Sequence, residues 1–404
     1  MSWADWIKRR IWRAGESRDA PPSSTPPEQW TVRGLSFDTR GWVLTRTSPQ
    51  EMIWTASSGT LSLSRTHVAP SVPVSVSEIR KVARGEARAG GEDIVQVDLV
   101  SAGGGEALRV LSKRRCGSGY AYKGVLELPR TNGRYVITVE IDEGNHTGGR
   151  EAMVNAARLS MGEVPVDRLL QGDGKIPGFA LDPYDAAFDD DALHSVSDDP
   201  RLDPLLPGHA LSRMRESLAT IVATLVVDDG EAASPVAGDT TATPSRPLLP
   251  HHVLRFIFAS AERHDLVEQS LRWEIDELGE TASVPLARCL LQLGVSLHLH
   301  DQAAKAGPLL ARAEALFQVL VGEDAEPTAL ARAHHGIALM KVSQRARALP
   351  LLLKAIGRFE KGTDDVATYT LVLANAAQLL AEHDEVRARE YVERAQSLMQ
   401  RIRR

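Results

Sequence analysis

The sequence predicts two domains: an α+β N-terminal domain, in which an antiparallel sheet packs with helices, and an all-α helical-repeat C-terminal domain. Short β-rich runs separated by turn residues fill the first half of the chain. Helical periodicity continues from residue 251 to the end, and one segment recurs within it. Between the halves, DDGEAASPVAGDTTATPSRPLLP (228–250) has the small, polar, Pro-containing composition of a domain boundary.

These features divide the chain into four segments. Residues 1–29 form a basic, Trp-rich arm and a Pro/Ser linker, and residues 30–228 form the α+β domain. A flexible linker covers residues 229–250, and the repeats cover residues 251–404. The arm can be drawn as an amphipathic helix, so a peripheral membrane adaptor acting through residues 1–13 is one alternative function. Its apolar side would carry Trp3, Trp6, Ile7 and Ile11, opposite Lys8, Arg9 and Arg13.

Composition excludes several classes of protein. The 404 residues are 43% hydrophobic and 25% charged with a net charge of −6, and no basic stripe for phosphates runs through either half, so we expect no nucleic-acid partner. Cys116 and Cys289 make no disulfide framework, which favours a reducing compartment. Neither a secretory signal nor an apolar run of about 18–20 residues is present. We expect a soluble, cytoplasmic protein. Only 9 of the 47 basic residues are Lys, and this low share is typical of proteins from GC-rich bacterial genomes.

Alternation of apolar and polar residues predicts the strands of the first domain. In 93–100 it places Val95, Val97 and Leu99 on one face. Asn132-Gly133, between two alternating runs, predicts a tight hairpin. The other expected strands are 42–47, 51–56, 60–66 and 107–112.

Helical spacing predicts three helices around these strands. SVSEIRKVARGEA begins with Ser75 and Glu78 in capping-box spacing, a second helix covers about 148–160, and a third covers 209–227. The first would bury Val76, Ile79 and Val82, and the third Leu211, Met214, Leu218, Ile221 and Leu225. Hairpin-paired strands with helices before and after them resemble the PsbP/DcrB-type α+β sandwich over roughly residues 35–160. That resemblance implies a domain that binds proteins, lipids or ions.

The second half contains an internal repeat. Residues 294–317 and 336–359 are identical at ten of 24 positions without a gap, and 376–399 fits the same register. Small residues recur at Gly294, Gly336 and Ala376 in the first helix of each unit, where two helices must cross closely. In the second helix they recur at Ala306, Ala348 and Ala388, then at Ala313, Ala355 and Ala395.

This pattern resembles the tetratricopeptide repeat, although the period is 42 and then 40 residues and Pro308 and Pro350 lie near the first turn of each second helix. The resemblance implies a concave groove that binds protein. It assigns the groove to Arg288, Leu291, Val295, His298 and Leu299, to Leu330, Ala333, Ile337, Met340 and Lys341, and to Thr370, Leu373, Ala377, Leu380 and Ala381.

The sequence leaves two candidate occupants of this groove. Because the assigned residues are mostly apolar, an apolar helix of a protein partner is one. The other is the chain itself, through the helix at 209–227 or the helices within 253–279. Either way the predicted function is non-enzymatic protein binding, as a scaffold or chaperone-like protein, without a cofactor. The sequence does not indicate an oligomeric state.

EIDEGNHTGGREA (140–152) offers the rival hypothesis of a metal-dependent hydrolase. Glu140, Asp142, His146 and Glu151 are suitable ligands and bases. An ordinary strand end followed by a helix explains most of these residue types, because Glu140 and Asp142 alternate with apolar neighbours and Glu151 falls in a first helical turn. We therefore predict no catalytic residue and no metal ligand there.

Three smaller features are predicted to have no specific function. DPYDAAFDDDALHSVSDDPRLD (182–203) is interpreted as a solvated acidic connector. His298 and His334 could meet across stacked helices, but we expect them to hold no metal. Cys116 is interpreted as a plain loop thiol.

Overall fold

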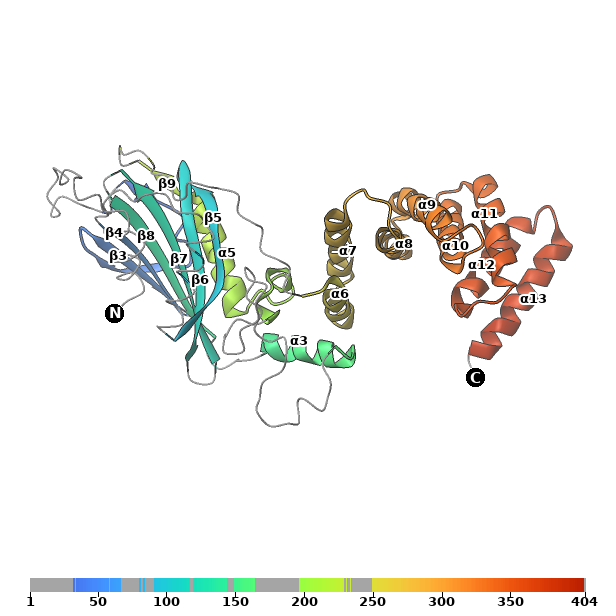
Figure 1. The fold of residues 1–404 in the computed structure, drawn as a ribbon, viewed down its shortest axis with the longest axis horizontal. Coiled ribbons are helices and arrows are strands. Elements are labelled where there is room, and N and C mark those ends of the chain that lie inside the picture. The colour runs from blue at the N-terminus through green and yellow to red at the C-terminus, as the bar shows by residue number, and fades with distance from the viewer. Residues whose placement is uncertain are drawn as a thin grey trace. The chain divides into compact units, whose positions relative to one another are not determined.

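A computed structural model describes residue 32 and residues 34–57, 59–66, 80, 83, 91–116, 119–131, 133–143, 149–163, 196–228, 230, 233 and 249–402. Contacts within the chain divide it into two units, Met1–Val253 and Leu254–Arg404. The first carries an antiparallel sheet and the second a run of helices, which confirms the predicted fold class (Figure 1).

Seven strands form the main sheet in the order β2-β3-β4-β8-β7-β6-β5, and all neighbours are antiparallel. The predicted hairpin is confirmed, because β7 and β8 pair from Arg130 and Gly133 onward. The strands are β1 (Leu35–Ser36), β2 (Val43–Thr47), β3 (Glu51–Ala56), β4 (Gly59–Thr66), β5 (Glu92–Ala102), β6 (Gly105–Cys116), β7 (Gly119–Arg130), β8 (Gly133–Asp142) and β9 (Val226–Val227). The helices are α3 (Gly149–Ser160), η3 (Val196–Asp198), η4 (Pro200–Leu202) and α5 (Ala210–Thr224).

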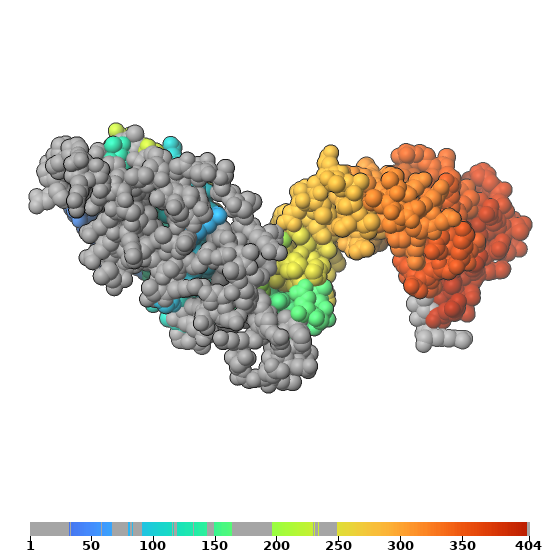
Figure 2. Space-filling view, in the orientation of Figure 1, coloured from blue at the N-terminus to red at the C-terminus, as the bar shows by residue number. Residues whose placement is uncertain are grey.

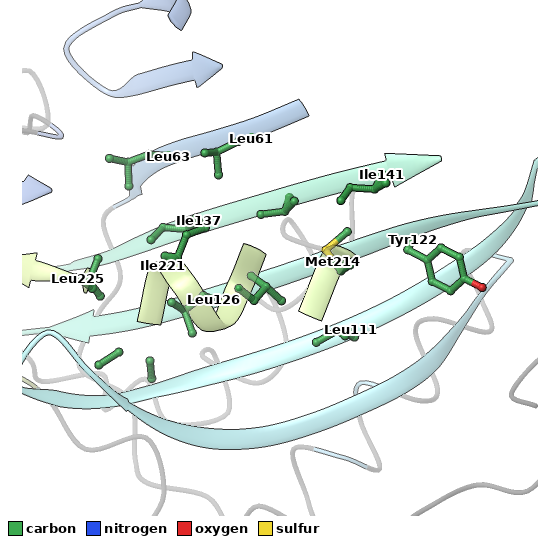
Figure 3. Packing of buried hydrophobic residues seen from close by; sticks show 14 of the residues in the cluster. Leu61, Leu63, Leu111, Tyr122, Leu126, Ile137, Ile141, Met214, Ile221 and Leu225 are labelled. Atoms are coloured by element: carbon green, nitrogen blue, oxygen red, sulfur yellow. The ribbon is translucent and has the colours of Figure 1, made fainter. Parts of the chain in front are cut away.

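One face of the sheet is covered by α5 (Figure 3). The predicted apolar stripe of this helix is buried against strand residues such as Leu126 and Ile137. Gly124 on β7 permits the close approach: a Cβ there would lie 2.6 Å from Leu218 Cδ1 and 2.7 Å from Met214 Sδ. The helix ends earlier than predicted, however, since the chain becomes extended at Leu225 and continues as β9, which pairs with β1.

The prediction that Val95 shares a face with Val97 and Leu99 is wrong. A register shift between Ile94 and Gln96 interrupts the alternation of β5. Val95 consequently packs with the α5 side of the sheet, while Val97 and Leu99 pack on the opposite face. Of the helix expected after Ser75, only residues 80 and 83 are described, and both are helical.

A buried polar cluster attaches the second half of the first unit to the sheet. Lys113 Nζ lies 2.6 Å from Asp198 Oδ2, and both side chains are fully buried. Arg150 donates to Asp203 Oδ1 over 2.9 Å and to Ser212 Oγ over 3.1 Å. The interpretation of 182–203 as a solvated connector is therefore wrong at its C-terminal end, because Asp198 meets a buried ammonium there.

Eight described helices, α6–α13, follow. From α7 to α13 each helix packs on the next one in the chain, and the colour of the second unit accordingly changes continuously from yellow to red (Figure 2). Their bounds are α6 (His251–Ser260), α7 (His264–Leu278), α8 (Val284–Leu299), α9 (Ala303–Leu320), α10 (Glu326–Lys341), α11 (Arg345–Phe359), α12 (Val366–Leu380) and α13 (Glu385–Ile402). The small positions lie where predicted: a Cβ on Gly294 would come within 2.6 Å of Leu310 Cγ, and one on Gly336 within 2.8 Å of Leu352 Cδ2.

The two prolines lie deeper in their helices than expected. Because α9 begins at Ala303 and α11 at Arg345, Pro308 and Pro350 occupy the second helical turn and not the first. Each therefore removes one intrahelical N–H donor from its helix.

Candidate protein-binding groove

A hollow of about 460 Å³ opens on the second unit between α7, α8, α10 and the start of α12. First helices of three successive units thus contribute to it, together with the preceding α7. Its lining residues are His264, Leu291, Gln292, Val295, Ser296, Leu299, His300, Leu330, His334 and Asp365.

The apolar part of the hollow follows directly from helical spacing. Leu291, Val295 and Leu299 recur every four residues and therefore lie along one side of α8. Leu330 of α10 lines the same hollow. Leu299 is 61% exposed, a large apolar area for a surface residue. Leu291 and Val295 are partly buried against the cluster in which Leu293 and Leu297 are buried, so the row lies at the border between this core and the hollow.

Two imidazoles join α8 to α10 at this place. His298 Nε2 and His334 Nδ1 lie 3.0 Å apart, and the ring planes meet at 34°. His298 is almost completely buried, whereas His334 lines the hollow. Burial, followed by the neighbouring His298, lowers the pKa of His334 to about 4, and burial followed by Lys341 lowers that of His298. Both rings are therefore neutral near pH 7.

The acidic groups bordering the hollow already have partners. Asp365 caps α12, accepting from Thr368 N and Thr368 Oγ1 over 2.8 Å each. Glu268 accepts from Ser296 Oγ over 3.2 Å and lies 3.5 Å from His300 Nδ1. The hollow therefore presents apolar side chains, a neutral histidine pair and one hydrogen-bonded carboxylate, that of Asp365.

The sequence-assigned groove residues fall into three groups. Leu291, Val295 and Leu330 line the hollow, as does Leu299. Exposed or half-buried outside it are Arg288, Met340 and Lys341, whose Nζ donates to His298 O over 2.5 Å. Buried in the repeat cores or beneath the hollow are His298, Ala333, Ile337, Thr370, Leu373, Ala377 and Leu380.

The sequence did not assign six of the lining residues to the groove: His264, Gln292, Ser296, His300, His334 and Asp365. Gln292 and Ser296 each follow an assigned apolar residue on α8, so a wider stripe would have included them. His264 precedes the recognised repeats, and its place beside His300, with ring centroids 4.9 Å apart, depends on how α7 packs on α8. The expected meeting of His298 and His334 does occur.

Neither segment of the chain considered as an occupant fills the hollow. Residues 210–224 form α5, which is buried against the sheet of the first unit. Helix α7 packs through Leu271 against Cys289 and Leu293 of α8 and forms one wall of the hollow.

The acidic stretch at 140–151 does not assemble into a site in the part that the structure describes. Glu140 and Asp142 are exposed on β8, and Glu151 lies in the first turn of α3, where it accepts from Ser197 Oγ over 3.0 Å. Glu143 is instead buried, with its Oε1 2.9 Å from His209 Nε2. His146 lies outside the described residues, as do residues 1–13.

The described side chains give no support to a metal centre or to a membrane span. No three His, Cys, Asp or Glu residues among them are grouped so that they could hold a metal ion. None of the described helices has both the length and the apolar character needed to cross a bilayer.

Comparisons with known proteins reach only the level of fold. No protein-family model and no curated protein matches the sequence. The crystal structure of BtubC (BKLC) from P. vanneervenii is 17% identical with a TM-score of 0.37, over 63% of this chain and 92% of that one. A candidate kinesin light chain of Podosopora anserina with nearly identical TPR-like repeats is 14% identical with a TM-score of 0.31, over 41% and 81% of the two chains. A variant of that protein is 15% identical with a TM-score of 0.31, over 40% and 78%.

These solved structures are tetratricopeptide-like repeat proteins, but TM-scores below 0.5 carry no argument about function. The tetratricopeptide-like character of the second unit rests on its own paired helices and on the small residues at their crossings. The PsbP/DcrB-type resemblance of the first unit stays a prediction.

Proposed function

We propose that this protein is a non-enzymatic scaffold or chaperone-like protein that binds the apolar face of a helix of another protein in the hollow between α7, α8 and α10. The observation that carries the proposal is the row of Leu291, Val295 and Leu299 on α8, which lines the hollow together with Leu330 of α10. An amphipathic helix presents apolar side chains at the same spacing and can lie against such a row.

The composition of the hollow supports this partner. Four of its ten lining residues are leucine or valine, so the apolar face of a helix has apolar surface to pack against, and Asp365 adds one carboxylate. Two cysteines, both unpaired, agree with a reducing compartment such as the cytoplasm.

The test uses a designed peptide, capped at both ends, with Leu at three positions of one helical face and Gln and Lys on the other. We expect the full-length protein to bind it and Val295→Lys to weaken binding at least tenfold, because an ammonium would enter the apolar row. Val319→Lys is the matched control: Val319 is 82% exposed on α9 and does not line the hollow. Equal loss in both variants, or no binding to the wild type, would contradict the proposal.

A further inference from the structure

The carboxylate of Asp365 is the acidic group that lines the hollow, and the ten lining residues include no lysine or arginine. His334 lines the hollow as well, but burial lowers the pKa of its imidazole to about 4, so this ring carries no charge near pH 7. Within the described chain, no lysine or arginine forms an ion pair with Asp365. The negative charge of this side chain therefore has no such counter-ion there.

The two basic residues that the repeat register assigns to the groove do not supply one. Lys341 Nζ donates to His298 O and lies 3.3 Å from Asp301 Oδ1, so its ammonium is already engaged. Arg288 is exposed on α8 and makes no ion pair with Asp365. A cation for this carboxylate has to come from the molecule that enters the hollow.

Asp365 is held in a fixed position and keeps the capacity to accept further hydrogen bonds. It is the N-cap of α12, with Oδ1 accepting from Thr368 N and Oδ2 from Thr368 Oγ1 over 2.8 Å each. Both donors are neutral, so the bonds orient the carboxylate without removing its net charge. Because a carboxylate oxygen has two lone pairs, each oxygen can accept one more bond. The side chain is only half-buried, which leaves it open to a ligand in the hollow.

An apolar helix that covers the hollow removes water from this carboxylate. Taking a charge out of water without a counter-ion costs far more free energy than burying a neutral group. A lysine or arginine beside the apolar side chains of the helix offsets that cost through a charge-assisted hydrogen bond. A neutral side chain at the same position offsets less of it, and a carboxylate adds repulsion.

We propose that Asp365 is a specificity-determining residue of the hollow and selects partner helices that carry a lysine or arginine beside their apolar face. This inference rests on the proposed function and specifies its partner. The leucine and valine side chains of α8 and α10 contact the apolar face, and Asp365 fixes the register of the helix by pairing with the flanking cation.

Paired peptides test the selection in the full-length protein. Each peptide is capped at both ends and carries three Leu on one helical face and Gln on the other, and one flanking position holds Lys or Nε-acetyl-lysine. Acetylation keeps an N–H donor but removes the charge. The flanking position is scanned along the face. We expect the wild type to bind the best Lys peptide about five- to tenfold more tightly than its acetylated form at low salt, and the preference to shrink in about 0.5 M NaCl.

Variants of the carboxylate separate its charge from its capping role. Asp365→Asn keeps a good N-cap for α12 and removes the charge, so it should bind the two peptides equally. Asp365→Glu keeps the charge and should retain part of the preference. Asp364→Asn is the matched control, because Asp364 is exposed and does not line the hollow, and this variant should keep the preference. A preference that persists in Asp365→Asn, or that Asp364→Asn also loses, overturns the inference.

The amide NMR signal of Thr368 locates the contact. Because this N–H donates to Asp365 Oδ1, we expect its signal to move more with the Lys peptide than with the acetylated peptide. Equal movement with both contradicts the inference. Equal affinity of the wild type for both peptides at every scanned position leaves the proposed function standing and removes this inference alone. Failure of the wild type to bind either peptide removes both.

Discussion

At the scale of single residues, the neutral histidine pair couples the stability of the repeat unit to pH. Burial lowers the pKa of His334 to about 4 in the folded protein, from an ordinary value of about 6.5 for histidine. The unfolded chain therefore binds more protons between these values, and stability is lost as pH falls from about 6.5 to about 4. His298 opposes protonation of His334, and Asp365 favours it. Lys341 opposes protonation of His298.

Chemical denaturation at pH 7 and pH 4.5 measures this effect. We expect His334→Phe to remove on the order of 2 kcal/mol of the acid-induced loss, less than the full shift because the ring is partly exposed. His383→Phe, at an exposed histidine outside the hollow, should leave the loss unchanged. An identical pH dependence in His334→Phe and the wild type would contradict the assignment.

The two cysteines differ in reactivity for a reason visible in their surroundings. Burial, reinforced by the nearby Glu274, raises the pKa of the Cys289 thiol to about 12. Cys116 is exposed at the end of β6. Because the thiolate is the reactive form, we expect a thiol reagent at pH 8 to modify Cys116 rapidly and Cys289 only after unfolding. Ellman's titration of native Cys116→Ser and Cys289→Ser proteins checks this, and rapid modification of native Cys116→Ser would refute it.

At the scale of elements, two glycines of neighbouring helices should respond in opposite ways to alanine. A Cβ on Gly294 of α8 would lie 2.6 Å from Leu310 Cγ, in the middle of a buried side chain, whereas Gly307 of α9 has no atom within 4 Å. Gly294→Ala is expected to cost about 1–2 kcal/mol, since overpacking outweighs the gain in helix propensity. Gly307→Ala is expected to stabilise by about 0.5–1 kcal/mol. Denaturant unfolding gives both values, and stabilisation in both would contradict the close crossing of α8 and α9.

The ion pair between Lys113 and Asp198 fixes η3 to β6 and should depend on both partners. Lys113→Met leaves a buried carboxylate without its ammonium, which is expected to cost about 3–5 kcal/mol. Lys113→Met combined with Asp198→Leu should cost less than the single change. Arg109→Met, on the same strand, removes a pair that is 21% and 26% exposed and should cost about 1 kcal/mol or less. Equal losses for Lys113→Met and Arg109→Met would contradict this account.

Some elements of the fold follow from local sequence patterns, and others do not. Period-2 and helical spacing identified the seven strands of the main sheet, α3, α5 and the repeat helices, because burial on one face imposes that spacing. The bulge in β5 and the pairing of β9 with β1 depend on partners far away in sequence. Leu249 falls in the predicted flexible linker but is buried. Its N–H donates to Asp199 Oδ2 over 2.9 Å, and residue spacing along the sequence does not reveal this contact.

At the scale of the whole molecule, the hollow depends on how several helices stack and not on one motif. Leu291, Val295 and Leu330, which the repeat register assigns to the groove, line the hollow. The same register also named Leu373 and Leu380, which the next helices bury. A repeat position is exposed only where the neighbouring helices do not cover it. The sequence therefore predicted a groove but could not predict how far the groove extends.

The hollow should function without the first unit. All ten of its lining residues fall within α7–α12, and the apolar clusters of the repeats draw on residues 267–398. We expect a fragment of residues 251–404 to fold, with amide signals of residues 284–402 that match those of the full chain. Its affinity for the three-Leu peptide should equal that of the full-length protein within about twofold. Tighter binding by the fragment would show that part of residues 1–250 competes for the hollow, and an unfolded fragment would show that the repeats need the first unit.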